Sequence, residues 1–184
     1  MFKYYHIDRS NTLTTGDIIR PEDFIFGKGY RDKFRKANLD PKNNGDVGKA
    51  IILPEETRRE FYLEYVRIHN PYLHDMTLPS RLDSFFAVKT VEVATELAKN
   101  RMKAGGDYSL YEVYTEDEPL AFDMNWLDQE FPANINSRVR YYHEYWIGSK
   151  MKDNKDLNTH EKRETLMELL ITKPVKIGDL IRRR

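Results

Sequence analysis

Three short motifs hold most of the side chains that could do chemistry. Residues 4–9 read Tyr-Tyr-His-Ile-Asp-Arg, residues 81–87 read Arg-Leu-Asp-Ser-Phe-Phe-Ala, and residues 168–171 read Glu-Leu-Leu-Ile. The pattern places a histidine on a first strand, an arginine before an aromatic strand, and a glutamate at the opening of a late strand. An imidazole, a guanidinium and a carboxylate are groups that could hold a sugar phosphate and act on it.

His6 lies between aromatic and β-branched residues. A histidine in a strand can be a packed, hydrogen-bonded structural residue. Its two ring nitrogens differ in role, so the ring can also bond a backbone group through one nitrogen and a ribose hydroxyl through the other. Both interpretations stay open from the sequence.

Arg81 and the phenylalanines after it have similar alternatives. Arg81 is either a solvated residue at the entrance of a strand or a clamp for a diphosphate, which a planar guanidinium binds well. Phe85 and Phe86 are candidates for the hydrophobic core, and one of them could instead stack on a flat ligand ring.

Two carboxylates are candidate acids. Glu168 is either the last exposed residue of the charged segment before it or a carboxylate held rigidly beside a ribose. In the second case its negative charge would stabilise the oxocarbenium-like centre that forms when an N-glycosidic bond breaks. Asp123 lies among apolar and aromatic residues, where a carboxylate is costly unless it is paired. It either caps a turn or helix, or orients a substrate.

Composition excludes several other classes of site. The 184 residues suit a single domain over 1–184, and 30 Lys plus Arg balance 30 Asp plus Glu, which argues against charge-driven binding to nucleic acid in bulk. The sequence has no cysteine, which excludes disulfides and thiolate sites, and no histidine pair has a zinc spacing, so no metal is expected. No apolar run or leader pattern stands out, so we expect a cytoplasmic protein without a membrane partner.

The local patterns predict strands and helices at uneven spacing, which indicates an α+β fold. Strands are predicted at 2–7, 84–88, 108–114 and 139–147, and residues 166–171 and 175–181 are predicted to be two short strands, or one strand and a turn. Helices are predicted from Pro54 to Asn70 and from Thr90 to Gly105-Gly106, with a strand or short helix at 120–127. Residues 20–50 are broken by glycine, proline and asparagine and are predicted to be a long loop region, and 148–162 an exposed loop insertion.

These motifs resemble ADP-ribosyltransferases. Residues 5–17 are similar to the first strand and turn of the rifamycin-type family, 84–98 to its second strand and helix, and 110–134 to its central stretch. Asp123 then falls at that family's catalytic aspartate, and Phe86 where the family has tyrosine. Residues 168–177 look instead like the last catalytic strand of DarT-type nucleic-acid ADP-ribosyltransferases, whose glutamate opens the strand. The arrangement also resembles an uncharacterised family of bacterial and phage domains.

The resemblance implies a fold, a reaction and a set of site residues. The fold would be α+β, with split antiparallel sheets, flanking helices and a cleft for NAD. The reaction would transfer ADP-ribose from NAD, as a substrate, to an acceptor and release nicotinamide. His6 would bind the adenosine-side ribose, Arg81 and Ser84 would contact the diphosphate or a ribose, and Arg9 would make a further contact with NAD. Phe86 or Tyr5 would stack on the nicotinamide ring. Glu168 would be the key acid, with Asp123 as second choice.

Other possibilities stay open. The acceptor could be a protein, a nucleic acid or a small molecule, and the segment 20–50 could select the acceptor or cover the NAD. The phenylalanine at position 86 also fits a catalytically degenerate domain of this fold that binds a nucleotide or a partner. A third possibility is a structural or interaction domain whose tyrosines form a partner surface.

Overall fold

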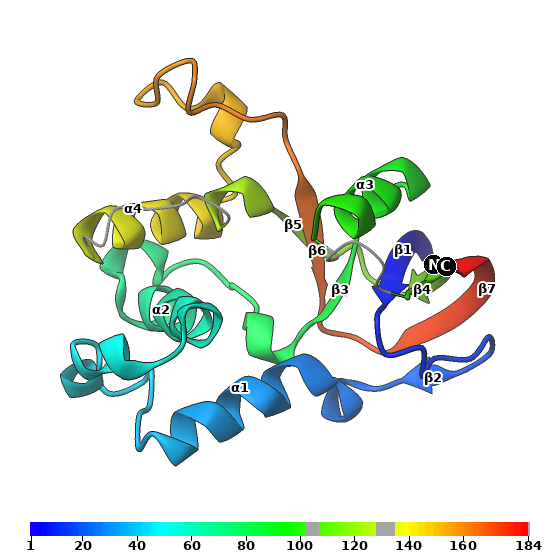
Figure 1. Cartoon of the computed structure of the whole chain (residues 1–184), viewed down its shortest axis with the longest axis horizontal. Helices are drawn as coiled ribbons and strands as arrows, with labels where there is room; N and C mark the ends of the chain where they lie inside the picture. The colour runs from blue at the N-terminus through cyan, green and yellow to red at the C-terminus, as the bar shows by residue number, and fades with distance from the viewer. Residues whose placement is uncertain (102–106, 128–134, 184) are drawn as a thin grey trace. The chain divides into compact units, whose positions relative to one another are not determined.

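The computed structural model describes residues 1–101, 107–127 and 135–183 (Figure 1). Its strands are β1 (Phe2–Asp8), β2 (Ile18–Ile19), β3 (Phe85–Ala87), β4 (Ser109–Thr115), β5 (Leu120–Asp123), β6 (Met167–Ile171) and β7 (Val175–Arg183). Its α-helices are α1 (Ile25–Lys36), α2 (Glu55–His69), α3 (Val91–Arg101) and α4 (Ile135–Trp146). Helices and antiparallel sheets thus occur together, and the predicted α+β class is confirmed.

The chain divides into two compact units that alternate along the sequence. Unit 1 comprises Met1–Phe24, Ser84–Ala121 and Met167–Arg184, and unit 2 comprises Ile25–Asp83 and Phe122–Leu166. The single domain expected from chain length stays a prediction. Each unit is described by itself below.

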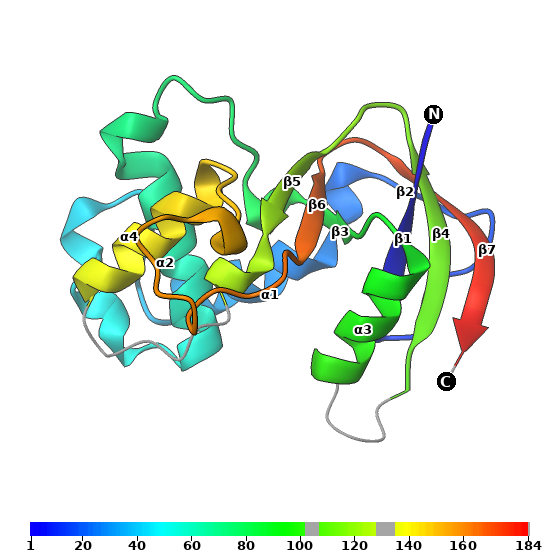
Figure 2. The ribbon, with the colours of Figure 1, turned by 90° about the horizontal axis from the view of Figure 1, so that it is seen from above.

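Unit 1 contains the sheets, apart from Phe122 and Asp123 at the end of β5, which belong to unit 2. One has the strand order β1-β4-β7-β2, and the other has the order β3-β6-β5 (Figure 2). β1 pairs with β4 along its whole length, from Phe2 opposite Thr115 to Asp8 opposite Ser109. On its other edge β1 forms an isolated antiparallel bridge to Val88, with Tyr5 N donating to Val88 O at 2.9 Å and Val88 N donating to Tyr5 O at 2.8 Å. This bridge fixes β1 beside the end of β3.

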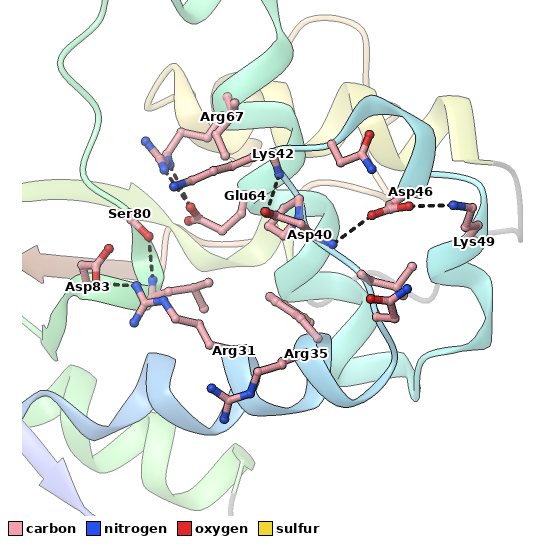
Figure 3. Close-up of a pocket in the computed structure, with 17 residues that line it drawn as sticks. Arg31, Arg35, Asp40, Lys42, Asp46, Lys49, Glu64, Arg67, Ser80 and Asp83 are labelled. Atoms are coloured by element: carbon pink, nitrogen blue, oxygen red, sulfur yellow. Dashed lines mark hydrogen bonds and ion pairs between the residues drawn. The ribbon is translucent and has the colours of Figure 1, made fainter.

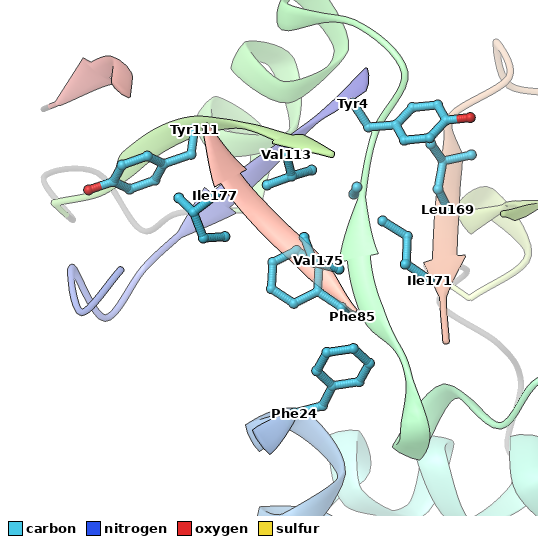
Figure 4. Close-up of a cluster of buried hydrophobic side chains, with 10 residues drawn as sticks. Tyr4, Phe24, Phe85, Tyr111, Val113, Leu169, Ile171, Val175 and Ile177 are labelled. Atoms are coloured by element: carbon cyan, nitrogen blue, oxygen red, sulfur yellow. The ribbon is translucent and has the colours of Figure 1, made fainter. Parts of the chain in front are cut away.

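The hydrophobic core of unit 1 is formed by side chains from both sheets (Figure 4). Its members are Tyr4, Phe24, Phe85, Ala87, Tyr111, Val113, Leu169, Ile171, Val175 and Ile177. Alternate residues of each strand point to one face, so Phe85 with Ala87 and Leu169 with Ile171 mark the core faces of β3 and β6. The residues between them must face the opposite side.

Unit 2 is helical. α2 packs against both α1 and α4, and the indole nitrogen of Trp146 on α4 donates to the Leu63 carbonyl on α2 at 2.9 Å. The proline and acid pattern predicted the start of α2: Pro54 is the N-cap, and Glu55 and Glu56 lie in the first turn, where acidic side chains favour the helix dipole. Asn70 is the C-cap, as the Asn-Pro pair predicted.

The predicted strand at 139–147 is wrong, because these residues belong to helix α4. Tyr142, Tyr145 and Trp146 are buried, at helical spacings of three and four residues. Aromatic residues favour strands in general, but here they bury one face of α4 against the rest of unit 2. The predicted end of the other helix at Gly105-Gly106 lies outside the described residues.

The prediction of a loop over 20–50 is also wrong in part, because residues 25–36 form helix α1. Two glycines and few periodic apolar residues made a helix look unfavourable there. Gly27 is needed for packing, however: a Cβ at this position would lie 1.8 Å from the carbonyl oxygen of Leu82. The close approach of α1 to this backbone fixes the helix, and tertiary contact outweighs the low helix propensity of glycine.

Two glycines of α1 make a matched pair for testing this packing. Gly27→Ala should lower the free energy of unfolding by about 3 kcal/mol, because a backbone carbonyl cannot move aside as a side chain can. Gly29→Ala should raise it by about 0.5–1 kcal/mol, since nothing lies within 4 Å of a Cβ there and alanine favours the helix. Urea unfolding measures both. Equal effects of the two substitutions would contradict the packing of α1 on Leu82.

Candidate functional site

The ring of His6 connects β1 to β3. Its Nδ1 lies 2.6 Å from the carbonyl oxygen of Phe86, and the ring packs on that of Phe85 with centroids 4.3 Å apart. A carbonyl oxygen only accepts hydrogen bonds, so Nδ1 carries the proton and Nε2 of the neutral ring is an acceptor. The residue is only partly buried, and Nε2 is the ring atom that could receive a hydroxyl hydrogen from a ligand.

Burial holds the pKa of His6 below its ordinary value of 6.5, and the hydrogen bond to the Phe86 carbonyl opposes this only in part. The neutral form is therefore favoured in the folded protein near neutral pH. Because the folded pKa is lowered, the unfolded chain takes up its proton first as the pH falls. The contribution of neutral His6 to the free energy of unfolding is thus fully present above about pH 6.5, and it is lost as the pH falls from there to the folded pKa.

His6→Asn should reduce this pH dependence of stability. The asparagine amide can still donate to the Phe86 carbonyl but does not titrate. We expect the loss of unfolding free energy between about pH 7.5 and about pH 5 to be smaller in the variant than in the wild type. Urea unfolding at the two pH values measures it, and the other four histidines cancel in the comparison. An identical loss in both proteins would contradict the lowered pKa.

Asp8 fixes the turn that follows β1. Its Oδ1 accepts from the Ser10 amide at 2.9 Å and the Ser10 hydroxyl at 2.6 Å, and its Oδ2 accepts from the Leu13 amide at 2.9 Å. Burial alone would raise the pKa of Asp8, but these hydrogen bonds outweigh it and lower the pKa. Arg9, a predicted NAD contact, is exposed at the start of this turn.

The pairing of β3 with β6 places Phe86 and Glu168 on one face of the sheet. Phe86 pairs with Leu170, and side chains of directly opposed residues point to the same side. Glu168 is two residues before Leu170 and shares that side. Glu168 is 3% exposed and Ser84, which precedes β3, is 1% exposed. The predicted acid is therefore a buried carboxylate on a strand, not an exposed end of the charged segment before it.

Tyr5 lies on the same side as these residues. Its bridge partner Val88 is two residues after Phe86, so the side chains of Tyr5, Val88, Phe86 and Glu168 all belong to the face opposite the core. His6 is adjacent to Tyr5 and faces the other way, against Phe85. Its Nδ1 still reaches the main chain of β3 at Phe86.

Arg81, a predicted diphosphate contact, belongs to unit 2 and is buried there. Its Nε donates to Glu60 Oε2 at 3.0 Å, its Nη1 to the Tyr145 hydroxyl at 2.8 Å, and its backbone amide to Glu64 Oε1 at 3.2 Å. The Arg81 side chain is 4% exposed and that of Glu60 is fully buried. These bonds link α2, α4 and the segment before β3. A diphosphate contact would require this buried ion pair to break, which is costly.

Asp123, the second candidate acid, is fully buried in unit 2. Its Oδ1 accepts from the Asn125 amide at 3.1 Å, the Asn125 side chain at 2.8 Å and the Leu166 amide at 3.2 Å. Its Oδ2 accepts from the Met151 amide at 2.9 Å. Asp123 is also the N-cap of the short 3-10 helix Met124–Trp126. Its carboxylate therefore caps a helix and joins two distant segments, which is the structural alternative that the sequence left open.

The predicted site residues fall into two groups. Unit 1 holds Tyr5, His6, Arg9, Ser84, Phe86 and Glu168, while unit 2 holds Arg81 and Asp123. Within unit 1, the register of β3 with β6 and the bridge of β1 to Val88 put His6, Phe86 and Glu168 on neighbouring strands, with the side chains of Phe86 and Glu168 on one face and that of His6 on the other. The candidate site is therefore built on β1, β3 and β6 of unit 1.

A pocket in unit 2 was missed from the sequence. It has a volume of about 790 Å³ and is lined by residues of α1, α2, the segment between them and the segment before β3 (Figure 3). The available signal was a concentration of basic residues: α1 contains Lys28, Arg31, Lys33, Arg35 and Lys36 against the single acid Asp32. Zero net charge over the chain hid this local excess.

Among the described residues, no group of three or more His, Cys, Asp or Glu side chains could hold a metal ion. None of the helices in the described part of the chain is both long enough and apolar enough to cross a membrane.

Comparison with known proteins gives no family assignment. No protein-family model matches the chain, and no curated protein matches it in sequence.

Proposed function

We propose that the chain is an NAD-dependent ADP-ribosyltransferase whose reacting groups lie on β1, β3 and β6 of unit 1. The observation that carries the proposal is the bond from His6 Nδ1 to the Phe86 carbonyl, on a strand whose partner β6 carries the buried Glu168. The order of the motifs and their resemblance to this class of transferase support it further.

His6 holds a ribose of NAD. Its Nδ1–H is engaged by the Phe86 carbonyl, so its Nε2 accepts a hydrogen from a ribose hydroxyl. A lowered pKa keeps the ring neutral, which this acceptor role requires. Phe86 or Tyr5 stacks on the nicotinamide ring. Phe86 has no hydroxyl, so stacking is the whole of its contribution.

Glu168 acts on the nicotinamide ribose. The bond between the ribose C1′ and the nicotinamide nitrogen breaks, and its electron pair leaves with nicotinamide, which becomes neutral. The positive charge that builds up on the ribose is stabilised by the Glu168 carboxylate, which also accepts a hydrogen bond from a ribose hydroxyl. A lone pair of the acceptor then bonds to C1′, and the acceptor releases a proton to water.

The remaining contacts follow from the positions of the side chains. Arg9 is exposed at the end of β1 and is assigned to the diphosphate, with Ser84 as a second polar contact. Arg81 is assigned a structural role in place of a diphosphate contact, because its guanidinium already bonds Glu60 and Tyr145.

Label transfer tests the proposal. The protein is incubated with cell lysate and NAD labelled in its adenylate phosphate, and label in macromolecules and small molecules is counted together with free nicotinamide. Nicotinamide release matched by label transfer supports a transferase. Nicotinamide release with label only in free ADP-ribose would overturn the transfer step. NAD binding without release would indicate a catalytically degenerate binding domain, and absence of NAD binding would overturn the proposal as a whole.

A further inference from the structure

The pocket of unit 2 is lined by a group of apolar side chains, here called the floor, and by a group of charged side chains, here called the rim. Its floor includes Phe34, Leu39 and Leu82, each of which is buried. The rim carries five cationic and four acidic side chains, namely Arg31, Arg35, Lys42, Lys49 and Arg67 with Asp40, Asp46, Glu64 and Asp83. The excess of charge is small, so the hydrogen-bonding state of each group decides what the pocket can bind.

The acidic groups of the rim are already engaged within the protein. Asp46 accepts from the Asp40 amide at 3.1 Å through one oxygen and from Lys49 at 2.9 Å through the other. Glu64 accepts from the Arg81 amide through Oε1 and from Arg67 through Oε2, at 3.2 and 2.8 Å. These carboxylates hold the loop and helices in place, and each of their oxygens already accepts a hydrogen bond within the protein.

The cationic groups have donors to spare. Within the described part of the chain, the Lys42 ammonium has no hydrogen-bond or ion-pair partner, while its backbone amide bonds Asp40. Arg31 pairs with Asp83 through one of its terminal nitrogens, at an exposed position where such a pair contributes little. Figure 3 shows the Lys42 side chain extending toward Arg67 and Glu64, with Arg31 on another side of the pocket. A guanidinium has five N–H donors and an ammonium has three.

We propose that this pocket binds a small phosphorylated molecule with a flat or apolar part, of the class of a nucleoside monophosphate. The phosphate would be held by Lys42 and Arg31, with Arg67 beside them, since charge-assisted bonds to phosphate are strong. The flat part would lie on the Phe34 and Leu82 floor. The volume of about 790 Å³ lies in the range of small-molecule sites. This site is separate from the residues of unit 1 assigned to NAD.

Titration calorimetry of the full chain with AMP, adenosine and inorganic phosphate tests the site. AMP should bind more tightly than either adenosine or phosphate, because only AMP offers both parts. Replacing Lys42 and Arg31 together by alanine should weaken AMP binding by at least about tenfold. The matched control replaces Lys28 and Lys36, which are exposed on α1 outside the pocket, and should change AMP binding by less than about twofold.

Each other outcome overturns the proposal. Absence of AMP binding in the wild type would overturn it. AMP binding that is insensitive to the Lys42 and Arg31 substitutions, as expected if AMP bound at His6 in unit 1, would also overturn it. The Lys28 and Lys36 control could lose as much AMP affinity as the Lys42 and Arg31 variant, and the wild type could bind a single-stranded oligonucleotide more tightly than AMP. These two results together would show a general polyanion surface on α1. Nicotinamide release should be the same in all these variants, so the proposed transferase activity and this site succeed or fail separately.

Discussion

Replacing Asp123 by alanine is expected to lower the free energy of unfolding by about 3–5 kcal/mol. The substitution removes the acceptor of four hydrogen bonds and leaves the amides of Asn125, Met151 and Leu166 without it. A buried N–H without a partner costs about 1–3 kcal/mol, and the contributions do not add fully. Chemical unfolding of the purified protein measures the loss.

Asp117→Ala is the matched control for this prediction. Asp117 is exposed in the turn after β4, so its replacement removes the same charge with little effect on stability. A loss of less than about 1 kcal/mol in Asp123→Ala would contradict the structural role of Asp123. Asp123→Asn, assayed well below its unfolding temperature, should still release nicotinamide if Asp123 is not the catalytic acid.

The second large effect concerns Glu168. Glu168→Gln is expected to lower the rate of nicotinamide release by about 10²–10³-fold, because the amide keeps the shape of the side chain but loses the negative charge. NAD binding should change much less, since the charge acts mainly when the ribose becomes positive in the transition state. Single-turnover release of nicotinamide and a separate NAD titration distinguish the two quantities.

Glu164→Gln controls for the loss of one negative charge. Glu164 lies four residues before Glu168, and its side chain is 96% exposed. Its replacement should leave the release rate within about twofold of the wild type, because solvent screens an exposed charge. Equal rate losses in Glu164→Gln and Glu168→Gln would show a general charge effect. An unchanged rate in Glu168→Gln would show that the acid is misassigned.

Local patterns predicted the elements whose ends carry strong signals. The alternating run after Gly106 became β4, and the Pro-Glu-Glu start and Asn-Pro end became the bounds of α2. α1 and α4 were missed for opposite reasons. Gly27 in α1 is favourable only because the Leu82 backbone approaches it. Leu82 is distant in sequence, so the local pattern around Gly27 holds no sign of this contact. The aromatic residues of α4 favour strands locally, although their spacing of three and four residues is that of a helix.

The candidate site was predictable as a set of residue types but not as a set of contacts. The sequence allowed His6 to bond a backbone group, but the identity of that group, the Phe86 carbonyl, depends on β1 lying beside β3. The buried partners of Arg81 and Asp123 are also distant in sequence: Glu60 is 21 residues from Arg81, and Leu166 is 43 residues from Asp123. Long-range pairing of this kind leaves no local periodicity to detect.

The assignment of Glu168 as the acid that acts on NAD is tested most directly by nicotinamide release from the wild type, Glu168→Gln and Asp123→Asn, measured side by side. We expect release by the wild type and by Asp123→Asn, and a loss of about 10²–10³-fold in Glu168→Gln. The opposite order, with activity lost in folded Asp123→Asn and kept in Glu168→Gln, would contradict it, as would a wild-type protein that releases no nicotinamide.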